Sequence, residues 1–209
     1  PIWDTSLATH ALLEAGECDD AVARANRWMV ERQILDVEGD WAILRPDLRP
    51  GGWAFQYRND HYPDVDDTAV VAMALDRAGE PSQAESLSRA VEWIIGMQSA
   101  NGGWGAFDAD NTQYILNSIP FADHGALLDP PTADVSARCL SMLAQTGYGR
   151  DHQAVQRALR YLRDEQEADG SWFGRWGTNY VYGTWSVLCA LNAVREDMNQ
   201  PYIRKAVDW

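Results

Sequence analysis

The sequence predicts an all-α protein in which helical hairpins are arranged as an α/α toroid, and two observations carry this prediction. Helical segments alternate between amphipathic ones and predominantly apolar ones. Turns that combine glutamine with glycine and tryptophan recur between the helices. We therefore expect two concentric layers, with the apolar helices inside. Toroids of this kind close with about six helix pairs and the pattern supplies about three and a half, so we expect only part of an α6/α6 barrel.

The repeat is aligned on its turns, each of which follows a glutamine. The three pairs are Gln33 with Gly39-Asp40-Trp41, Gln98 with Gly102-Gly103-Trp104, and Gln166 with Gly170-Ser171-Trp172. The glycines end a helix and turn the chain. We expect the glutamine to cap a helix end and the indole to stack on the neighbouring repeat, so that both residues serve stability.

Helices are expected on both sides of these turns because apolar residues recur there at helical spacing. Amphipathic helices precede the turns at 90–97 and 158–163. More apolar helices are expected at 5–15, 70–78, 135–145 and 185–194.

Composition excludes several classes of protein. The 209 residues are 46% hydrophobic and 23% charged, which is typical of a globular protein with one sizeable core. The formal net charge of -14 argues against binding to nucleic acid, and against binding to anionic lipid by charge alone. Any membrane contact would have to be hydrophobic, and no run of 18 apolar residues or signal peptide is present in the sequence.

Two further features concern chemical environment and chain length. Cys18, Cys139 and Cys189 lack metal-type spacing, so we expect reduced, buried thiols.

The chain begins without Met and stops within an amphipathic helical pattern, so we expect an internal piece of a longer protein.

Three carboxylates stand within four positions at Asp64, Asp66 and Asp67, directly before an apolar helical run. So many neighbouring acids cannot all ionise cheaply, and at least one should keep its proton at a pH where a free Asp would lose it. We expect Asp66 or Asp67 to be the N-cap of a helix at 68–75, where the helix dipole stabilises an anion. The cluster is therefore a candidate general acid, although solvated loop acids with an ordinary cap would give the same letters.

Metal binding is the alternative use of these acids. Asp64, Asp66 and Asp67 could offer oxygen ligands to Ca²⁺ or Mg²⁺, but the segment lacks an EF-hand pattern. A zinc set is not apparent either, because the histidines are scattered at His10, His61, His124 and His152.

Several segments together resemble bacterial squalene-hopene cyclases over the whole chain. They are DVDDTAVV at 64–71, GGWAFQY at 51–57, DPPTADVSAR at 129–138, GSWFGRWGTNYVYGT at 170–184 and the glutamine–tryptophan turns. The resemblance implies a class II terpene cyclase, which protonates squalene and guides the cation to hopene or hopanol without metal or cofactor. It also implies that residues 1–209 are part of the catalytic α/α barrel of a longer two-barrel cyclase.

The resemblance implies roles for particular residues. Asp66 corresponds to the proton donor and Asp64 and Asp67 to its hydrogen-bonded neighbours, while Asp134 and Arg138 correspond to a second acid and a basic partner near the cluster. One well-known version of the family has histidine in place of Arg138; a guanidinium stays charged, so it would stabilise the Asp66 anion and not relay a proton. An ordinary ion pair between Arg138 and Asp134 across one helical turn is compatible with this role.

Other residues are implied as contacts of water and substrate. Tyr182 corresponds to a tyrosine that orders water near the acid, and π faces stabilise carbocations while excluding water. The aromatic residues implied to face the cavity are Trp3, Phe55, Tyr62, Phe107 and Trp176. For each of these residues taken singly, packing in the hydrophobic core is the alternative explanation. Phe107 stands where some family members carry Tyr, which could alter the products.

Partners and location follow from the substrate. Squalene is nearly insoluble, so the intact enzyme is expected at the cytoplasmic face of the cell membrane as a peripheral or monotopic protein, bound through regions outside this piece. The remainder of the same chain is the other expected partner, and a homodimer stays open. A class II cyclase of diterpene or sesquarterpene type is an alternative, as is a non-catalytic toroidal binding module.

Overall fold

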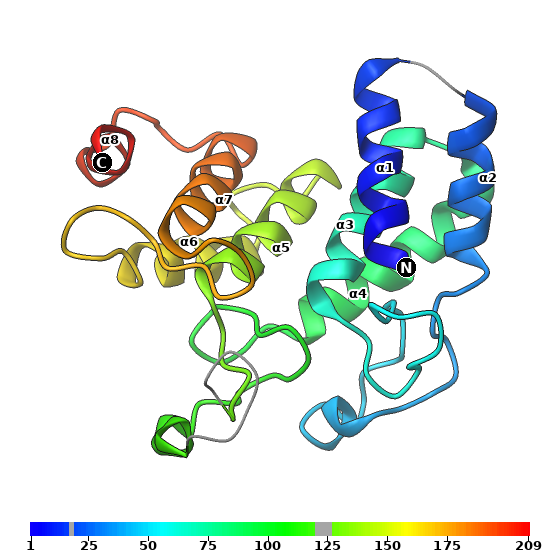
Figure 1. Ribbon diagram of the computed structural model, residues 1–209, viewed down its shortest axis with the longest axis horizontal. Coiled ribbons are helices and arrows are strands. Elements are labelled where there is room, and N and C mark those ends of the chain that lie inside the picture. The colour runs from blue at the N-terminus through cyan, green and yellow to red at the C-terminus, as the bar shows by residue number, and fades with distance from the viewer. Residues whose placement is uncertain (17–18, 120–126) are drawn as a thin grey trace. The chain divides into compact units, whose positions relative to one another are not determined.

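The computed structural model describes residues 1–16, 19–119 and 127–209, and these residues are helical apart from their connections. They divide into two compact units, Pro1–Met97 and Gln98–Trp209, each of which is described by itself (Figure 1). The described part contains a single antiparallel bridge, between Trp53 and Asp64, in place of any β-sheet. The prediction of an all-α protein is thus confirmed for these residues.

The α-helices alternate in character along the chain as predicted. The first unit contains α1 (Ile2–Ala15), α2 (Asp19–Val30), α3 (Val65–Ala78) and α4 (Ala84–Gly96), and the second contains α5 (Ala133–Gln145), α6 (Gln153–Asp164), α7 (Asn179–Ala193) and α8 (Pro201–Asp208). Short 3₁₀ helices lie at η1 (Asp40–Ile43), η2 (Pro81–Gln83) and η3 (Tyr114–Ser118). The apolar helices α1, α3, α5 and α7 match the four expected ones but begin earlier, because their first turns carry polar residues that hide the pattern.

Each unit is built on a pair of apolar helices. In the first unit α1 packs along α3, with α2 against both and α4 against α3 (Figure 1). In the second unit α5 packs along α7, with α6 against α5 and α8 against α7. The burial of the helices agrees with this arrangement. The apolar helix α3 is buried along most of its length, whereas the amphipathic helices α4 and α6 each bury one face.

The first repeat turn lies at Gly51-Gly52-Trp53 and not at the predicted Gly39-Asp40-Trp41. The amide of Ile34, the residue after the glutamine, donates to Gly52 O at 2.9 Å. The same bond recurs in the other two repeats, from Ser99 N to Gly103 O and from Glu167 N to Ser171 O. Trp41 instead lies in the short 3₁₀ helix η1 (Asp40–Ile43) and packs edge-on against Trp93, with ring centroids 5.8 Å apart.

The glutamines tie each turn to the next repeat. Each side-chain Nε2 donates to a carbonyl of its own turn and to a carbonyl at the start of the amphipathic helix that follows. The acceptor pairs are Gly51 and Ser86 for Gln33, Gly102 and Ala154 for Gln98, and Gly170 and Tyr202 for Gln166. The expectation that the glutamine caps a helix end is therefore corrected: it bridges two segments.

Two of the turn tryptophans donate indole hydrogen bonds to the helix before the turn, while stacking of the turn rings on the neighbouring repeat stays a prediction. The indole of Trp53 donates to Met29 O at 2.7 Å, and that of Trp172 donates to Leu162 O at 2.6 Å. Met29 and Leu162 lie in the helices that precede these turns, α2 and α6. The hydrogen bonds of both indoles thus stay within their own repeat, and the glutamine makes the link to the following one.

The turn glycines allow the following helix to pack directly on the turn. A Cβ on Gly51 would lie 2.3 Å from Arg89 O, and one on Gly102 would lie 2.5 Å from Arg157 O. Gly102 also has φ +98°, a conformation that residues with a side chain rarely adopt. The glycines at these positions are therefore required by close backbone contact as well as by the turn.

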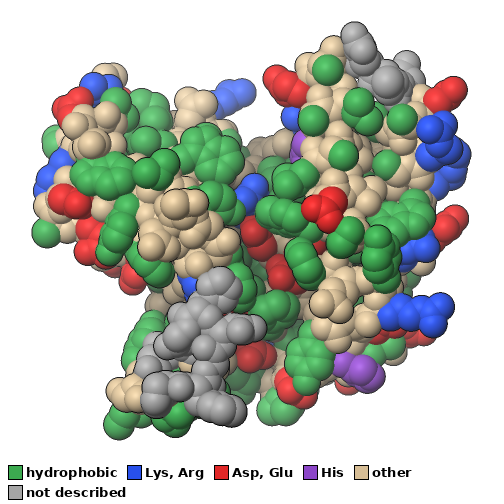
Figure 2. Space-filling model, viewed as in Figure 1, with side chains coloured by type: hydrophobic (Ala, Val, Ile, Leu, Met, Phe, Trp, Pro, Cys, Tyr) green, Lys and Arg blue, Asp and Glu red, His purple; other side chains and the backbone are tan. Residues whose placement is uncertain are grey.

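The cysteine prediction is half right. Cys139 is buried, but Cys189 is exposed, and Cys18 lies outside the described residues. Cys189 lies on the same face of α7 as Val181 and Trp185, which are 68% and 53% exposed. The apolar pattern of α7 thus includes a face that its own unit leaves exposed, and Figure 2 shows hydrophobic side chains at the surface of both units. None of the described helices is long and apolar enough to cross a bilayer.

Candidate active site

The acidic cluster sits at the start of α3, with a different cap from the one predicted. Asp64 is the N-cap: its Oδ1 accepts from the amides of Asp66 at 2.7 Å and Asp67 at 3.1 Å. The helix begins at Val65, so Asp66 and Asp67 lie within its first turn. The prediction of Asp66 or Asp67 as the cap is therefore wrong, because the first acid already satisfies the exposed amides.

Backbone contacts hold the cluster against the first repeat turn. The amide of Asp64 donates to Trp53 O at 2.8 Å. The buried hydroxyl of Thr68 accepts from Trp53 N at 2.9 Å and donates to Asp64 O at 2.6 Å. The start of α3 and the tryptophan turn are thus one hydrogen-bonded assembly, which fixes the direction of the carboxylates.

The three acids differ in exposure. Asp64 is 8% exposed and Asp67 is 2% exposed, whereas Asp66 is partly exposed. Burial raises the pKa of Asp64 well above its usual value, and the charges of Asp67 and Asp66 raise it further, against the opposing effect of the two amide bonds. The expectation that one acid keeps its proton is supported at Asp64. Asp66 is the member of the cluster that a ligand could reach.

Two of the three aromatic residues predicted in the first unit lie in the loop that this assembly closes, and the third lies in α1. Phe55 and Tyr62 are 46% and 47% exposed and belong to the connection between Trp53 and Asp64, whose two ends are bridged. The Tyr62 hydroxyl lies 3.5 Å from Asp40 Oδ2. Trp3 is partly buried in the first turns of α1. Their rings are thus available to a ligand, and their facing a common cavity stays a prediction.

In the second unit the predicted residues Asp134, Arg138 and Tyr182 lie on the packed helices α5 and α7. Arg138 Nη2 donates to the Tyr182 hydroxyl at 2.8 Å. Asp134 is buried, and its Oδ2 accepts from the amide of Trp176 at 2.9 Å. Its Oδ1 is buried without a hydrogen-bond partner in the described part of the chain. Asp134 therefore supports the segment of Trp176, a role that the sequence did not suggest.

Two predicted aromatic residues of this unit meet. The rings of Phe107 and Trp176 lie 6.2 Å apart between centroids and at 84°, an edge-to-face contact. The guanidinium of Arg175 stands 5.3 Å from the centroid of the Trp176 ring. The structure thus brings together Asp134, Arg138, Tyr182, Phe107 and Trp176 within one unit.

Two residues that hold predicted residues in place, one in each unit, were missed by sequence reasoning. Thr68 fixes the start of α3, and Asp129 accepts three backbone hydrogen bonds from residues 106–108. Burial raises the pKa of Asp129, while these amides and the charge of Arg175 act in the opposite direction. The Asp129-Pro130-Pro131 run indicates a turn, but nothing in it identifies the amides that the carboxylate binds.

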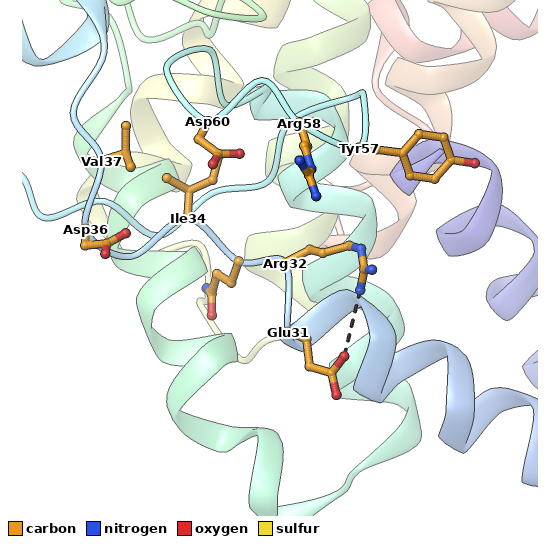
Figure 3. A pocket seen from close by; sticks show the side chains of 9 residues that line it. Glu31, Arg32, Ile34, Asp36, Val37, Tyr57, Arg58 and Asp60 are labelled. Atoms are coloured by element: carbon orange, nitrogen blue, oxygen red, sulfur yellow. Dashed lines mark ion pairs between the residues drawn. The ribbon is translucent and has the colours of Figure 1, made fainter.

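Possible metal ligands and a cavity were also considered among the residues that the structure describes. Within residues 1–16, 19–119 and 127–209 there is no group of three or more His, Cys, Asp or Glu side chains that could hold a metal ion; His124 lies outside them. A cavity of about 550 Å³ in the first unit is lined by charged side chains such as Arg58 and Asp60 and by the ion pair of Glu31 and Arg32 (Figure 3). Its lining includes none of the predicted catalytic or substrate-binding residues and does not suit an apolar ligand.

Comparisons with known proteins agree with the motifs. A squalene-hopene cyclase of Zymomonas mobilis is 62% identical over 216 residues, covering 100% of this chain and 33% of the relative. A squalene-hopene cyclase of Schizosaccharomyces japonicus is 63% identical, and the match covers 92% of this chain and 31% of the relative. One of Alicyclobacillus acidocaldarius is 50% identical, and the match covers 93% of this chain and 31% of the relative. The chain therefore spans about a third of the length of the curated relatives it matches.

Fold and family follow from two further findings. The solved structure of the type II terpene cyclase MstE from Scytonema has a TM-score of 0.71 and 20% identity, covering 100% of this chain and 54% of that one. This likeness confirms the α/α toroid fold class. The family model described as "Squalene-hopene cyclase C-terminal domain" matches residues 1–209. The chain therefore belongs to the squalene-hopene cyclase family, within its C-terminal domain.

Proposed function

We propose that residues 1–209 are part of the catalytic α/α barrel of a longer two-barrel enzyme that cyclises squalene to hopene or hopanol. The observation that carries the proposal is the cluster at the start of α3, where a partly exposed acid stands between two buried ones. Relatives that are 50% to 63% identical and named squalene-hopene cyclases support the choice of substrate.

Asp66 is the proton donor in this mechanism. Its carboxyl proton passes to a terminal alkene carbon of squalene, and the π electrons of that double bond form the new C–H bond and leave a tertiary cation. Each following double bond attacks the cation in turn, until loss of a proton gives hopene or capture of water gives hopanol. A dry site and a stabilised carboxylate are required, because an unactivated alkene is a very weak base.

The first turn of α3 supplies part of that stabilisation. Asp66 lies where the amides and dipole of the helix favour negative charge. Asp64 occupies the cap and binds the amide of Asp66, so it fixes the backbone of the donor. Asp67 is buried beside it and completes the cluster. Burial raises the pKa of Asp64, and Asp66 is the acid of the cluster that a ligand can reach, so we assign the transferred proton to Asp66.

The residues of the second unit act on the anion and on water in this proposal. Arg138 stays charged and stabilises the Asp66 carboxylate after proton transfer. Tyr182, whose hydroxyl accepts from Arg138, orders the water through which Asp66 regains its proton. Asp134 supports this side of the site through the amide of Trp176.

Aromatic rings line the path of the cation in the proposed enzyme. The rings assigned to it are Trp3, Phe55, Tyr62, Phe107 and Trp176. Their faces stabilise the cation and keep water from ending the cascade early. The edge-to-face contact of Phe107 and Trp176 supports their acting as one surface.

The substrate determines the proposed location and partners. An enzyme acting on squalene takes it from a bilayer, so we place the intact protein on the cytoplasmic face of the cell membrane as a peripheral or monotopic protein. Regions outside residues 1–209 make that contact, and they complete the barrel. A homodimer is compatible with this arrangement. The net charge of -14 disfavours nucleic acid as a partner.

A second candidate is a class II cyclase for another polyprenyl substrate. The fold is shared with the Scytonema enzyme, of which one structure holds geranylgeranyl dihydroxybenzoate as substrate. A non-catalytic binding module is disfavoured, because it would leave the acidic cluster unexplained.

Incubation in D₂O tests the reaction. The full-length protein that contains residues 1–209 is given squalene in detergent, and products are analysed by gas chromatography and mass spectrometry. Hopene carrying one deuterium on a ring-A methylene carbon is expected, because the initiating proton adds to the CH carbon of the terminal double bond and comes from an acid that exchanges with solvent. Unlabelled hopene would contradict proton initiation, and unchanged squalene with turnover of a shorter polyprenyl substrate would favour the second candidate.

A further inference from the structure

The carboxylate of Asp129 holds a turn of the second unit by three consecutive amides. Its Oδ1 accepts from Ala106 N at 3.1 Å, and its Oδ2 accepts from Phe107 N at 2.6 Å and from Asp108 N at 3.1 Å. Successive amides that converge on one anion form a concave binding site, and hydrogen bonds to an ionised acceptor are stronger than neutral ones. The central amide belongs to Phe107, so this contact fixes the backbone from which that ring projects.

The absence of a side chain at Gly105 makes the contact possible. A Cβ at this position would lie 2.7 Å from Asp129 O and 2.9 Å from Asp129 Oδ2. Both distances are shorter than real Cβ contacts. A larger residue at 105 would therefore push the carboxylate away from the amides without removing its charge.

The partner ring is held by a second carboxylate. Asp134 Oδ2 accepts from the amide of Trp176 at 2.9 Å, and the Trp176 ring meets Phe107 edge to face. Arg175, which stands over the Trp176 ring, also favours the anion of Asp129. Two acids of the 129–138 segment thus each anchor one ring of the same aromatic pair.

We propose that Asp129 is a positioning residue, which fixes the Phe107 ring against Trp176 through the backbone of 105–108 and so controls how far ring formation proceeds. The inference rests on the proposed cyclase function and adds a residue to it. A ring face stabilises a cation only when it lies close to the charged carbon. A Phe107 ring that moves with its turn would let the cation lose a proton early and release partly cyclised products.

The test compares Asp129→Asn, Phe107→Ala and the double variant in the full-length protein. Asparagine keeps the volume but loses the charge and one acceptor oxygen, so the turn should loosen while Asp66 still starts the reaction. Squalene consumption is expected to persist, with a larger fraction of partly cyclised products. Because Asp129 acts through Phe107, adding Asp129→Asn to Phe107→Ala should change the product ratio no further.

Hydrogen exchange measured by mass spectrometry supplies a readout that does not depend on squalene. The peptide covering 105–109 is expected to exchange about tenfold faster or more in Asp129→Asn, since each amide loses a charge-assisted bond. Asp47→Asn, at an exposed acid of the first unit, is the matched control and should change neither exchange nor products. Unchanged exchange in Asp129→Asn would show that the carboxylate does not anchor the turn.

Other outcomes separate this inference from the proposed function. Products identical to those of the parent, despite faster exchange, would overturn the inference while leaving the cyclase function intact. Additive changes in the double variant would show that Asp129 acts elsewhere. If the unmodified protein leaves squalene unchanged, the proposed function is wrong, and so is the proposed control of product formation by Asp129. Hydrogen exchange would then still show whether the Asp129 carboxylate anchors the turn. Should Asp129→Asn fail to fold, Gly105→Ala displaces the same carboxylate and is expected to give the same products.

Discussion

Thr68→Val removes one hydroxyl group beneath the acidic cluster and leaves the shape of the side chain nearly unchanged. Thr68 is fully buried, and its hydroxyl accepts from Trp53 N at 2.9 Å and donates to Asp64 O at 2.6 Å. Asp64 O still accepts from Thr68 N at 3.0 Å in the variant, so Trp53 N–H is the group left buried without a partner. Losing the bond costs about 1 kcal/mol and the orphaned donor a further 1–3 kcal/mol, so about 2–4 kcal/mol of stability should be lost.

Urea unfolding of the full-length protein, followed by tryptophan fluorescence, measures this loss. Thr68→Ser keeps the hydroxyl and removes only a methyl group, so it should cost about 1 kcal/mol. Ser136→Ala offers a parallel in the second unit, where Ser136 Oγ accepts from Trp104 N at 2.9 Å. A cost for Thr68→Val no larger than that for Thr68→Ser would refute the reasoning, because the hydroxyl would then contribute nothing.

Two further predictions concern pH and packing. The raised pKa of Asp64 means that its contribution to stability is fully present below its unfolded pKa and is lost as pH rises through its folded pKa. Asp64→Asn keeps a cap oxygen and cannot ionise. The free energy of unfolding of this variant, relative to that of the parent, should therefore rise between pH 4.5 and pH 7.5, by about 1.4 kcal/mol per unit of pKa shift. A difference between the two urea midpoints that is the same at both pH values would contradict this. Gly102→Ala combines φ +98° with a Cβ 2.5 Å from Arg157 O, so it should lower the stability of the protein by about 2 kcal/mol or more. Gly147→Ala has φ +94° but lies in open space, so it should lower stability by about 1 kcal/mol. Equal melting temperatures for the two variants would show that the backbone contact is harmless.

The alternation of helices could be predicted from sequence, because burial of an apolar face leaves a period of 3.6 residues in the letters. The first turn could not be identified in the same way. Gly39-Asp40-Trp41 and Gly51-Gly52-Trp53 both contain glycine and tryptophan after Gln33. The hydrogen bonds from Ile34 N to Gly52 O and from Gln33 Nε2 to Gly51 O identify the second as the turn. Spacing favoured the nearer candidate, whereas backbone hydrogen bonding selects the farther one.

The acidic cluster illustrates a second limit. Its position before an apolar helix was readable, but three acids within four positions left the cap ambiguous until the contacts of Asp64 with the amides of Asp66 and Asp67 were known. Asp129 was not identifiable at all, because a carboxylate that binds the backbone of 106–108 leaves no pattern in the letters between them. Long-range contacts between side chain and backbone depend on the path of the chain, which periodicity does not describe.

Conversion of squalene by Asp66→Asn, compared with the unmodified full-length protein and with Asp47→Asn, is the most direct test of the central claim. Circular dichroism and thermal melting should first show that all three proteins are folded alike. The account predicts cyclised products from the unmodified protein and from Asp47→Asn, and a loss of about 10³-fold or more in Asp66→Asn, because an amide cannot supply the initiating proton. Cyclisation by a folded Asp66→Asn variant at the unmodified rate would contradict the assignment of this cluster as the acid.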